Sequence, residues 1–200
     1  MRSLAAALMV AALGGWTLWA ATDGARAFTA EGARRLAVQQ NPRPVPDARL
    51  QTRTGDTLRL HDLQGRLVIV DFIYTRCMTF CTVMGNTLQT LQNRLPAELL
   101  GDEVVLLSIS FDPEHDTPRN LSVYGDRYAA QSGSWVIARV KDDSQLDALL
   151  ETFGITVIPD GQGGYQHNAA VHVVDRQGRL ARILDFDDPD AAMKAVQELL

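Results

Sequence analysis

The run RLVIVDFIYT, residues 66–75, constrains the fold of this chain more than any other stretch. It is an almost continuous apolar, β-branched run, which is the pattern of a strand buried on both faces. Two further runs share this pattern, EVVLLSISFD at 103–112 and SWVIARV at 134–140. Strands buried on both faces belong to sheets that are covered by helices, so the chain is predicted to be an α/β protein.

The segments between these runs are predicted to be helices. Apolar residues recur at helical spacing over 78–95, and Thr117 followed by Pro118 is typical of a helix start. Residues 143–154 are expected to be capped by Asp143 or Ser144 and to end at Gly154. A last helix is expected over 188–200.

Two hairpins complete the predicted domain. Residues 49–63 alternate around Thr54-Gly55-Asp56, and residues 169–184 contain two apolar runs separated by a turn at Gln177-Gly178. The order of elements is the thioredoxin-like arrangement, with an added N-terminal hairpin and a central mixed sheet. The domain is expected to cover residues 48–200.

The N-terminus differs from the domain in composition. Residues 3–22 carry no charge behind Arg2, and Ala25-Arg26-Ala27 has the form of a cleavage site. Residues 1–27 are therefore predicted to be a signal peptide or an uncleaved signal anchor, since the apolar stretch is long enough to span a bilayer. Three prolines between 42 and 46 predict an extended linker over 28–47. The domain is accordingly expected in the periplasm, with a possible inner-membrane anchor at residues 3–22.

The charge and the cysteine content exclude some classes of function. A net charge of −5 and the absence of any long basic run disfavour a nucleic-acid-binding protein. Two cysteines, Cys77 and Cys81, do not make a disulfide scaffold. They follow the first buried strand, at the start of the predicted helix, where helix N–H groups and the helix dipole stabilise a thiolate.

The spacing of the two cysteines favours a metal clamp, but it leaves other interpretations open. Helical residues four apart have Cβ atoms about 5–6 Å apart, whereas a disulfide needs roughly 3.5–4.5 Å. A metal between the two sulfurs tolerates the larger gap. A redox couple with a distorted helical turn, or two buried core cysteines, would also fit the sequence.

A third ligand must come from elsewhere, and the sequence holds four histidines. His167 follows the glycine-rich loop DGQGGY, which could carry its side chain over the helix start. His172 lies within a predicted strand and is expected to be a buried structural residue, while His61 and His115 are expected at the surface. Two thiolates and one imidazole suit a soft ion, above all copper.

Three blocks of sequence resemble the Sco/SenC family of copper-binding assembly proteins: DFIYTRCMTFC, SISFDPEHDTP and GGYQHNAAVHVVDRQGRL. The resemblance covers roughly residues 45–200. It implies a thioredoxin-like fold and an exported, membrane-associated domain. It also implies a copper ion held by Cys77, Cys81 and His167. The implied function is delivery of copper to the dinuclear copper site of a haem–copper oxidase, or to another copper protein, or reduction of that site's cysteines.

The match is not complete. The family commonly has proline after each cysteine, whereas this chain has Met78 and Thr82. Asp112 and Asp116 match a family block that we interpret as a structural turn and helix cap.

The alternative function is a thiol–disulfide oxidoreductase in which Cys77 and Cys81 are the catalytic pair, with a peroxidase as a weaker variant. A copper carrier requires a thiol reductant as a partner, because oxidised cysteines cannot load metal.

Overall fold

Strands β4 (Leu67–Ile73) and β5 (Val104–Ser110) form the centre of the fold, and every residue in both is buried. They pair in parallel over their full length. The computed structural model describes residues 2–77 and 80–200. It divides them into two units, Met1–Asn41 and Pro42–Leu200, and the central sheet belongs to the second. The prediction of buried central strands is thus confirmed.

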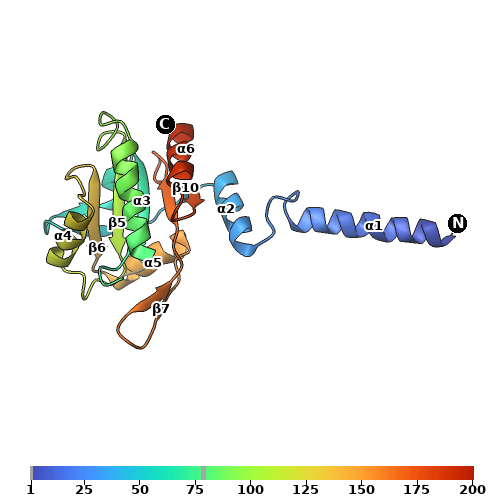
Figure 1. Cartoon of the computed structure of the whole chain (residues 1–200), viewed down its shortest axis with the longest axis horizontal. Helices are drawn as coiled ribbons and strands as arrows, with labels where there is room; N and C mark the ends of the chain where they lie inside the picture. Colours follow the sequence, from blue (N-terminus) through green and yellow to red (C-terminus); the bar gives the residue numbers. More distant parts are fainter. Residues whose placement is uncertain (1, 78–79) are drawn as a thin grey trace. The chain divides into compact units, whose positions relative to one another are not determined.

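An eight-stranded mixed sheet is built around this pair, in the order β1-β10-β9-β4-β5-β6-β2-β3. Figure 1 shows two of its neighbouring strands, β5 and β6, side by side. Strands β4, β5 and β6 are parallel, and the other pairings are antiparallel. The predicted N-terminal hairpin, β2–β3, extends the sheet beyond β6. The bounds of the remaining strands in this sheet are β1 Arg43–Pro44, β2 Arg49–Thr52, β3 Thr57–Arg59, β6 Trp135–Val140, β9 Val171–Val174 and β10 Arg179–Leu184.

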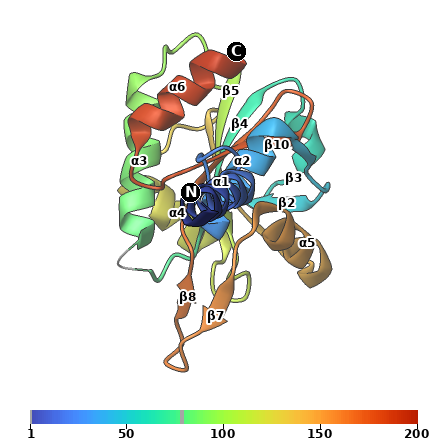
Figure 2. The same cartoon turned by 90° about the vertical axis from the view of Figure 1, so that its right-hand side faces the viewer.

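Helices cover both faces of the sheet, which explains why the central strands are apolar on both sides. Helix α3 (Phe80–Arg94) packs against α6 (Pro189–Leu199), and its Gln89 and Gln92 donate hydrogen bonds to the chain just after α4 (Pro118–Arg127). Helix α5 (Asp143–Phe153) covers the other face (Figure 2). The mixed α/β fold with helices on both faces is the thioredoxin-like arrangement that the sequence predicts.

The contact between α3 and the end of α4 depends on a glycine. A Cβ atom at Gly85 would lie 2.4 Å from the ring of Tyr128, well inside van der Waals contact. The absence of a side chain at this position lets the tyrosine ring lie directly against α3. The end of α4 can therefore pack closely against α3.

The structure differs from the sequence-based expectations in three places. Residues 28–47 are not an extended linker throughout, because α2 (Ala30–Gln40) forms there with Thr29 as its N-cap, and β1 follows. Helix α5 is capped by Asp142, whose side chain accepts from the Gln145 amide, and not by the next two residues. The glycine-rich loop is the tip of a separate hairpin, β7 (Val157–Pro159) and β8 (Tyr165–His167).

The first unit contains a long apolar helix, α1 (Arg2–Ala21). Its segment Ser3–Ala21 has a mean hydropathy of 1.7 and is long and apolar enough to cross a membrane. The identity of residues 1–27 as a signal peptide or an anchor stays a prediction.

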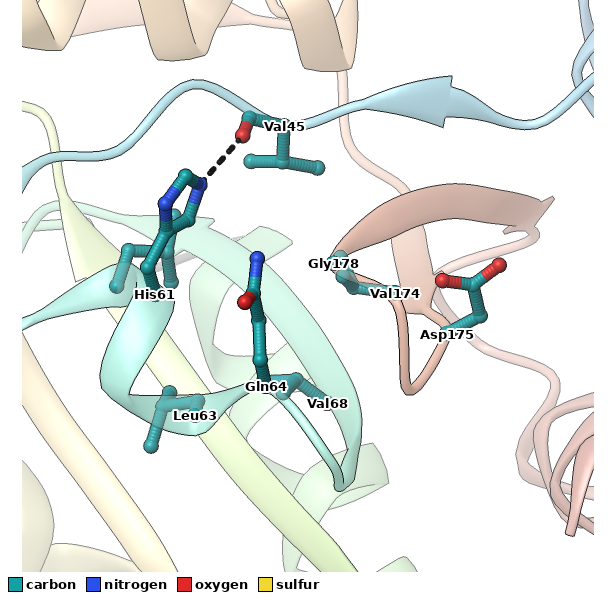
Figure 3. A pocket seen from close by; sticks show the side chains of 9 residues that line it. Val45, His61, Leu63, Gln64, Val68, Val174, Asp175 and Gly178 are labelled. Carbon is teal, nitrogen blue, oxygen red and sulfur yellow. Dashed lines mark hydrogen bonds between the residues drawn. The ribbon is translucent and has the colours of Figure 1, made fainter.

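The segment between β1 and β2, which includes Val45 and is here called the strap, closes a small apolar hollow on the second unit (Figure 3). The ring of His61, in the short 3-10 helix η1 (Leu60–Leu63), lies with Nε2 3.1 Å from the Val45 carbonyl oxygen. The hollow has a volume of about 10 Å³, and Val68 and Val174 are among the residues that line it. That volume is close to the minimum for a single water molecule, so the feature is a packing contact that fixes the strap.

Candidate metal centre

The two cysteines occupy different kinds of backbone. Cys77 lies in the loop after β4, while Cys81 is the second residue of α3 as described. This agrees with the expectation that Cys77 lies where the strand ends and the helix starts. The Cys81 amide donates a hydrogen bond to the Cys77 sulfur over 3.4 Å. The sulfur of Cys77 thus caps the first turn of α3, where an N–H donor and the helix dipole favour a thiolate.

His167 reaches this pair from the end of β8. Its Nε2 lies 3.9 Å from the Cys81 sulfur, and its Nδ1 lies 3.0 Å from the Asn168 carbonyl oxygen. Because a carbonyl can only accept, Nδ1 carries the proton of the neutral ring and Nε2 presents its lone pair to the sulfurs. The two sulfurs and an imidazole nitrogen all lie within 4.8 Å of one another. The expected convergence of Cys77, Cys81 and His167 is present, while their role as ligands remains a proposal.

Aromatic rings surround the imidazole of His167. Phe111 and Tyr74 lie in edge-on contact with it, with ring centroids at 5.0 and 5.9 Å. Tyr165 packs on both of these rings, and the Tyr74 hydroxyl donates to the Tyr165 carbonyl oxygen over 3.3 Å. These contacts restrict the ring to one orientation. Sequence reasoning missed them: all three residues lie in the blocks that resemble the family, but nothing in those blocks indicates that their rings meet.

Asp112 joins the loop of Cys77 to the hairpin of His167. Its buried carboxylate accepts from Arg76 at 2.7 Å, from the Tyr165 hydroxyl at 3.3 Å and from His115 Nδ1 at 2.9 Å. Burial acts to raise the pKa of Asp112, but the hydrogen bonds from Arg76 and His115 outweigh it and hold the pKa below its usual value. Arg76 precedes Cys77 directly, so this network positions the loop relative to the hairpin.

Asp116 anchors the same loop from a second side. It accepts hydrogen bonds from the Thr75 amide at 3.0 Å and the Thr75 hydroxyl at 2.6 Å, and from Ser110. Thr117 caps α4 by accepting from the Asn120 amide. The structural interpretation of this block is confirmed, and it extends further than the sequence indicated, because both aspartates hold the cysteine loop.

The other histidines do not enter the group. His172 is fully buried in β9, with Nε2 3.2 Å from the Phe153 carbonyl oxygen, as expected of a structural residue. His61 and His115 are exposed. Among the described residues, the only cluster of three metal-binding side chains with this proximity is Cys77, Cys81 and His167. Met78 lies outside the described residues, and Thr82 lies in α3.

Both sulfurs are shielded from solvent, since Cys77 is 5% exposed and Cys81 is 1% exposed. The hydrogen bond with Cys77 and then burial raise the pKa of the Cys81 thiol well above its usual value. Without a cation, the two sulfurs therefore do not both ionise at neutral pH. A soft cation would supply the charge that two adjacent thiolates need.

Comparison with known proteins agrees with this site. The SCO1/SenC family model matches residues 38–200, which is most of the chain. The chain belongs to the SCO1/SenC family. A SCO1 protein homolog from Bacillus subtilis is 28% identical over 134 residues, which cover 66% of this chain and 68% of that protein.

Solved structures of SCO1/SenC proteins share the fold. BsSco, described as a member of the Sco family of cytochrome c oxidase assembly proteins, superposes with a TM-score of 0.68 at 24% identity, covering 80% of this chain and 94% of that one. ScoI from Bradyrhizobium japonicum with copper bound gives a TM-score of 0.61 at 21% identity, covering 78% and 99%. At these identities the similarity establishes the thioredoxin-like fold of the SCO1/SenC chain.

Proposed function

We propose that this chain is an exported copper chaperone. Its cargo is a single copper ion held by the sulfurs of Cys77 and Cys81 and by Nε2 of His167. The observation that carries the proposal is the approach of these three ligand atoms to within 4.8 Å of one another. Copper prefers soft thiolate ligands together with imidazole, and three ligands leave the ion open to a fourth from an acceptor. The copper-bound structure of a family member from Bradyrhizobium japonicum supports the choice of metal.

The residues around the site prepare it for loading. His167 is held in the tautomer that leaves Nε2 free, because Nδ1 donates to the Asn168 carbonyl. Cys77 accepts from the Cys81 amide, which favours its thiolate. The thiol of Cys81 loses its proton as the metal binds, since only the thiolate is a ligand. Transfer then needs only ligand exchange, with an incoming ligand of the acceptor displacing these side chains one after another.

The acceptor that we propose is the dinuclear copper site of a haem–copper oxidase, in the periplasm. The description of BsSco as belonging to a family of cytochrome c oxidase assembly proteins supports this acceptor. Helix α1 supports export, because it is long and apolar enough to be a signal or an anchor.

Metal analysis of variants tests the copper site. The full chain, purified with a thiol reductant and loaded with copper, is expected to bind one equivalent. The double variant Cys77→Ser/Cys81→Ser is expected to bind none. His167→Ala is expected to lose affinity by on the order of 100-fold or more, because a directly bound ligand should matter at least as much as its supporting residues do. His61→Ala is the matched control, since this histidine is exposed and is not part of the group. Equal copper affinity in His167→Ala and His61→Ala would refute the site.

A thiol–disulfide oxidoreductase is the second candidate function. It is favoured by two cysteines that form no disulfide and lie close together where α3 begins, with Cys77 as the attacking sulfur. The same His167→Ala variant separates the two functions. It should retain disulfide exchange with a small-molecule thiol if the chain is an oxidoreductase, and lose tight copper binding if the chain is a chaperone.

A further inference from the structure

An open hollow of about 230 Å³ lies beside the cysteine loop, between that loop and α4. Two of its lining residues, Thr75 and Arg76, immediately precede Cys77. The rest of its wall is a single face of α4, at helical spacing i, i+3, i+4 and i+7: Asn120, Val123, Tyr124 and Arg127. A group seated in the hollow would therefore lie beside the loop that carries Cys77.

The hollow is basic although the chain is acidic overall. Its wall contains two arginines and no carboxylate, whereas the whole chain has a net charge of −5. Arg76 is partly engaged, since it forms an ion pair with Asp112 at 2.7 Å and is 40% exposed. Arg127 is exposed and has no hydrogen bond or ion pair within the part of the chain that the structure describes. Its guanidinium is thus available to an external anion.

The apolar part of the wall indicates what kind of anion fits. Val123 is 57% exposed at the centre of the α4 face, between Asn120 and Arg127. An alkyl chain that ends in a carboxylate would cover this valine and pair with the arginine fork, which matches carboxylate geometry. The side chains of glutamate and aspartate have this form, and the volume accommodates one or two of them.

We propose that this hollow is a docking site for an acidic segment of the protein that exchanges copper with Cys77 and Cys81. The proposal rests on the proposed chaperone function, because it places the acidic residues of the partner close to its own copper ligands. Arg127 is the principal contact, and Arg76 is the second. The site orients the partner so that its metal-binding side chains approach the sulfur pair from the α4 side.

Peptide binding to the full chain tests this proposal without using copper. Two dye-labelled synthetic peptides of the same length, without cysteine, are titrated against the metal-free chain in uncharged detergent. One alternates glutamate with serine, and the other has glutamine in place of each glutamate. Fluorescence anisotropy is expected to show about tenfold tighter binding of the glutamate peptide, and raised salt should weaken it.

The variants Arg127→Gln and Arg119→Gln are the matched pair. Both remove one exposed positive charge from α4, but only Arg127 lines the hollow. We expect Arg127→Gln to weaken binding of the glutamate peptide about three- to tenfold, and Arg119→Gln less than twofold. Equal losses in the two variants, or no preference for the glutamate peptide, would overturn the docking site. Copper binding is measured separately on copper-loaded portions of the same protein preparations, so a failure of the copper site is seen separately from a failure of docking.

Discussion

Asp71 is a carboxylic acid in the middle of the most buried strand. It is 0% exposed in β4, and neither of its oxygens has a hydrogen-bond partner among the described residues. Ser108 stands opposite it in the β4–β5 register, but its hydroxyl accepts from Trp135 and does not have hydrogen-bond geometry to the carboxylate. Burial raises the pKa of Asp71 to about 7, although the nearby Ser108 hydroxyl offsets part of this effect.

A pH-dependent loss of stability follows from this raised pKa. Between about pH 4 and pH 7 the folded state keeps the Asp71 proton, while the unfolded chain has already released it. The contribution of Asp71 to the free energy of unfolding is therefore greatest at acidic pH and is lost as the pH rises toward 7. The variant Asp71→Asn removes the titration. Relative to the unmodified chain, its free energy of unfolding is expected to rise by about 2–3 kcal/mol between pH 5 and pH 8.

Chemical denaturation of the metal-free full chain at both pH values measures this difference. Asp102→Asn is the control, because Asp102 is exposed in a turn before β5. The amide at position 71 has its own cost of burial, but that cost does not change with pH. A stability difference between Asp71→Asn and the unmodified chain that stayed constant from pH 5 to pH 8 would contradict the prediction.

The hairpin β7–β8 is the element that carries His167, and Asn168 closes its base. The Asn168 side chain accepts from the Thr156 amide at 2.7 Å and donates to the Gly154 carbonyl at 2.9 Å. These two hydrogen bonds tie the hairpin to the end of α5. The backbone carbonyl of Asn168 also fixes the His167 ring. The hairpin base therefore determines where the imidazole lies.

Replacement of Asn168 should weaken copper binding without removing a ligand. Asn168→Ala loses two hydrogen bonds of about 1 kcal/mol each, so copper affinity is expected to fall by up to about 30-fold. Competition with a copper chelator measures the change. Gln166→Ala in β8 is the control, because Gln166 is exposed. If both variants bound copper equally well, the hairpin base would have no role in placing His167.

The elements were predictable where local pattern determines them. The apolar runs gave β4, β5 and β6, and Gly154 ends α5 in the left-handed conformation as expected. Helix α2 was not predicted, because the prolines between residues 42 and 46 indicated extended chain over the whole segment. These prolines follow the helix and do not interrupt it.

The candidate site was only partly predictable. Cys77, Cys81 and His167 were found from residue chemistry, spacing and the family resemblance. The aromatic contacts of Tyr74 and the network of Asp112 depend on tertiary packing between elements far apart in sequence, which no local pattern encodes.

The path from α1 to the domain has a limited reach. If residues 30–40 were extended, these 11 residues would span about 36 Å. As helix α2 they span only about 16 Å. In a membrane-anchored form, this segment would therefore be a shorter tether than the fully extended linker that the sequence predicts. A cleaved form would have no such restriction, so the fate of α1 affects which acceptors the site can reach.

Export of the domain can be tested on the whole chain in a bacterial host. The segment Ser3–Ala21 would be about 28 Å long as a helix, close to the thickness of the bilayer core. We expect alkaline phosphatase fused after Leu200 to be active, because that enzyme needs disulfides that form in the periplasm and not in the cytosol. The same fusion without residues 2–22 should be inactive and serves as the control. Phosphatase activity that did not depend on residues 2–22 would refute export through this segment. N-terminal sequencing of the active fusion then distinguishes a retained α1 from cleavage after Ala27.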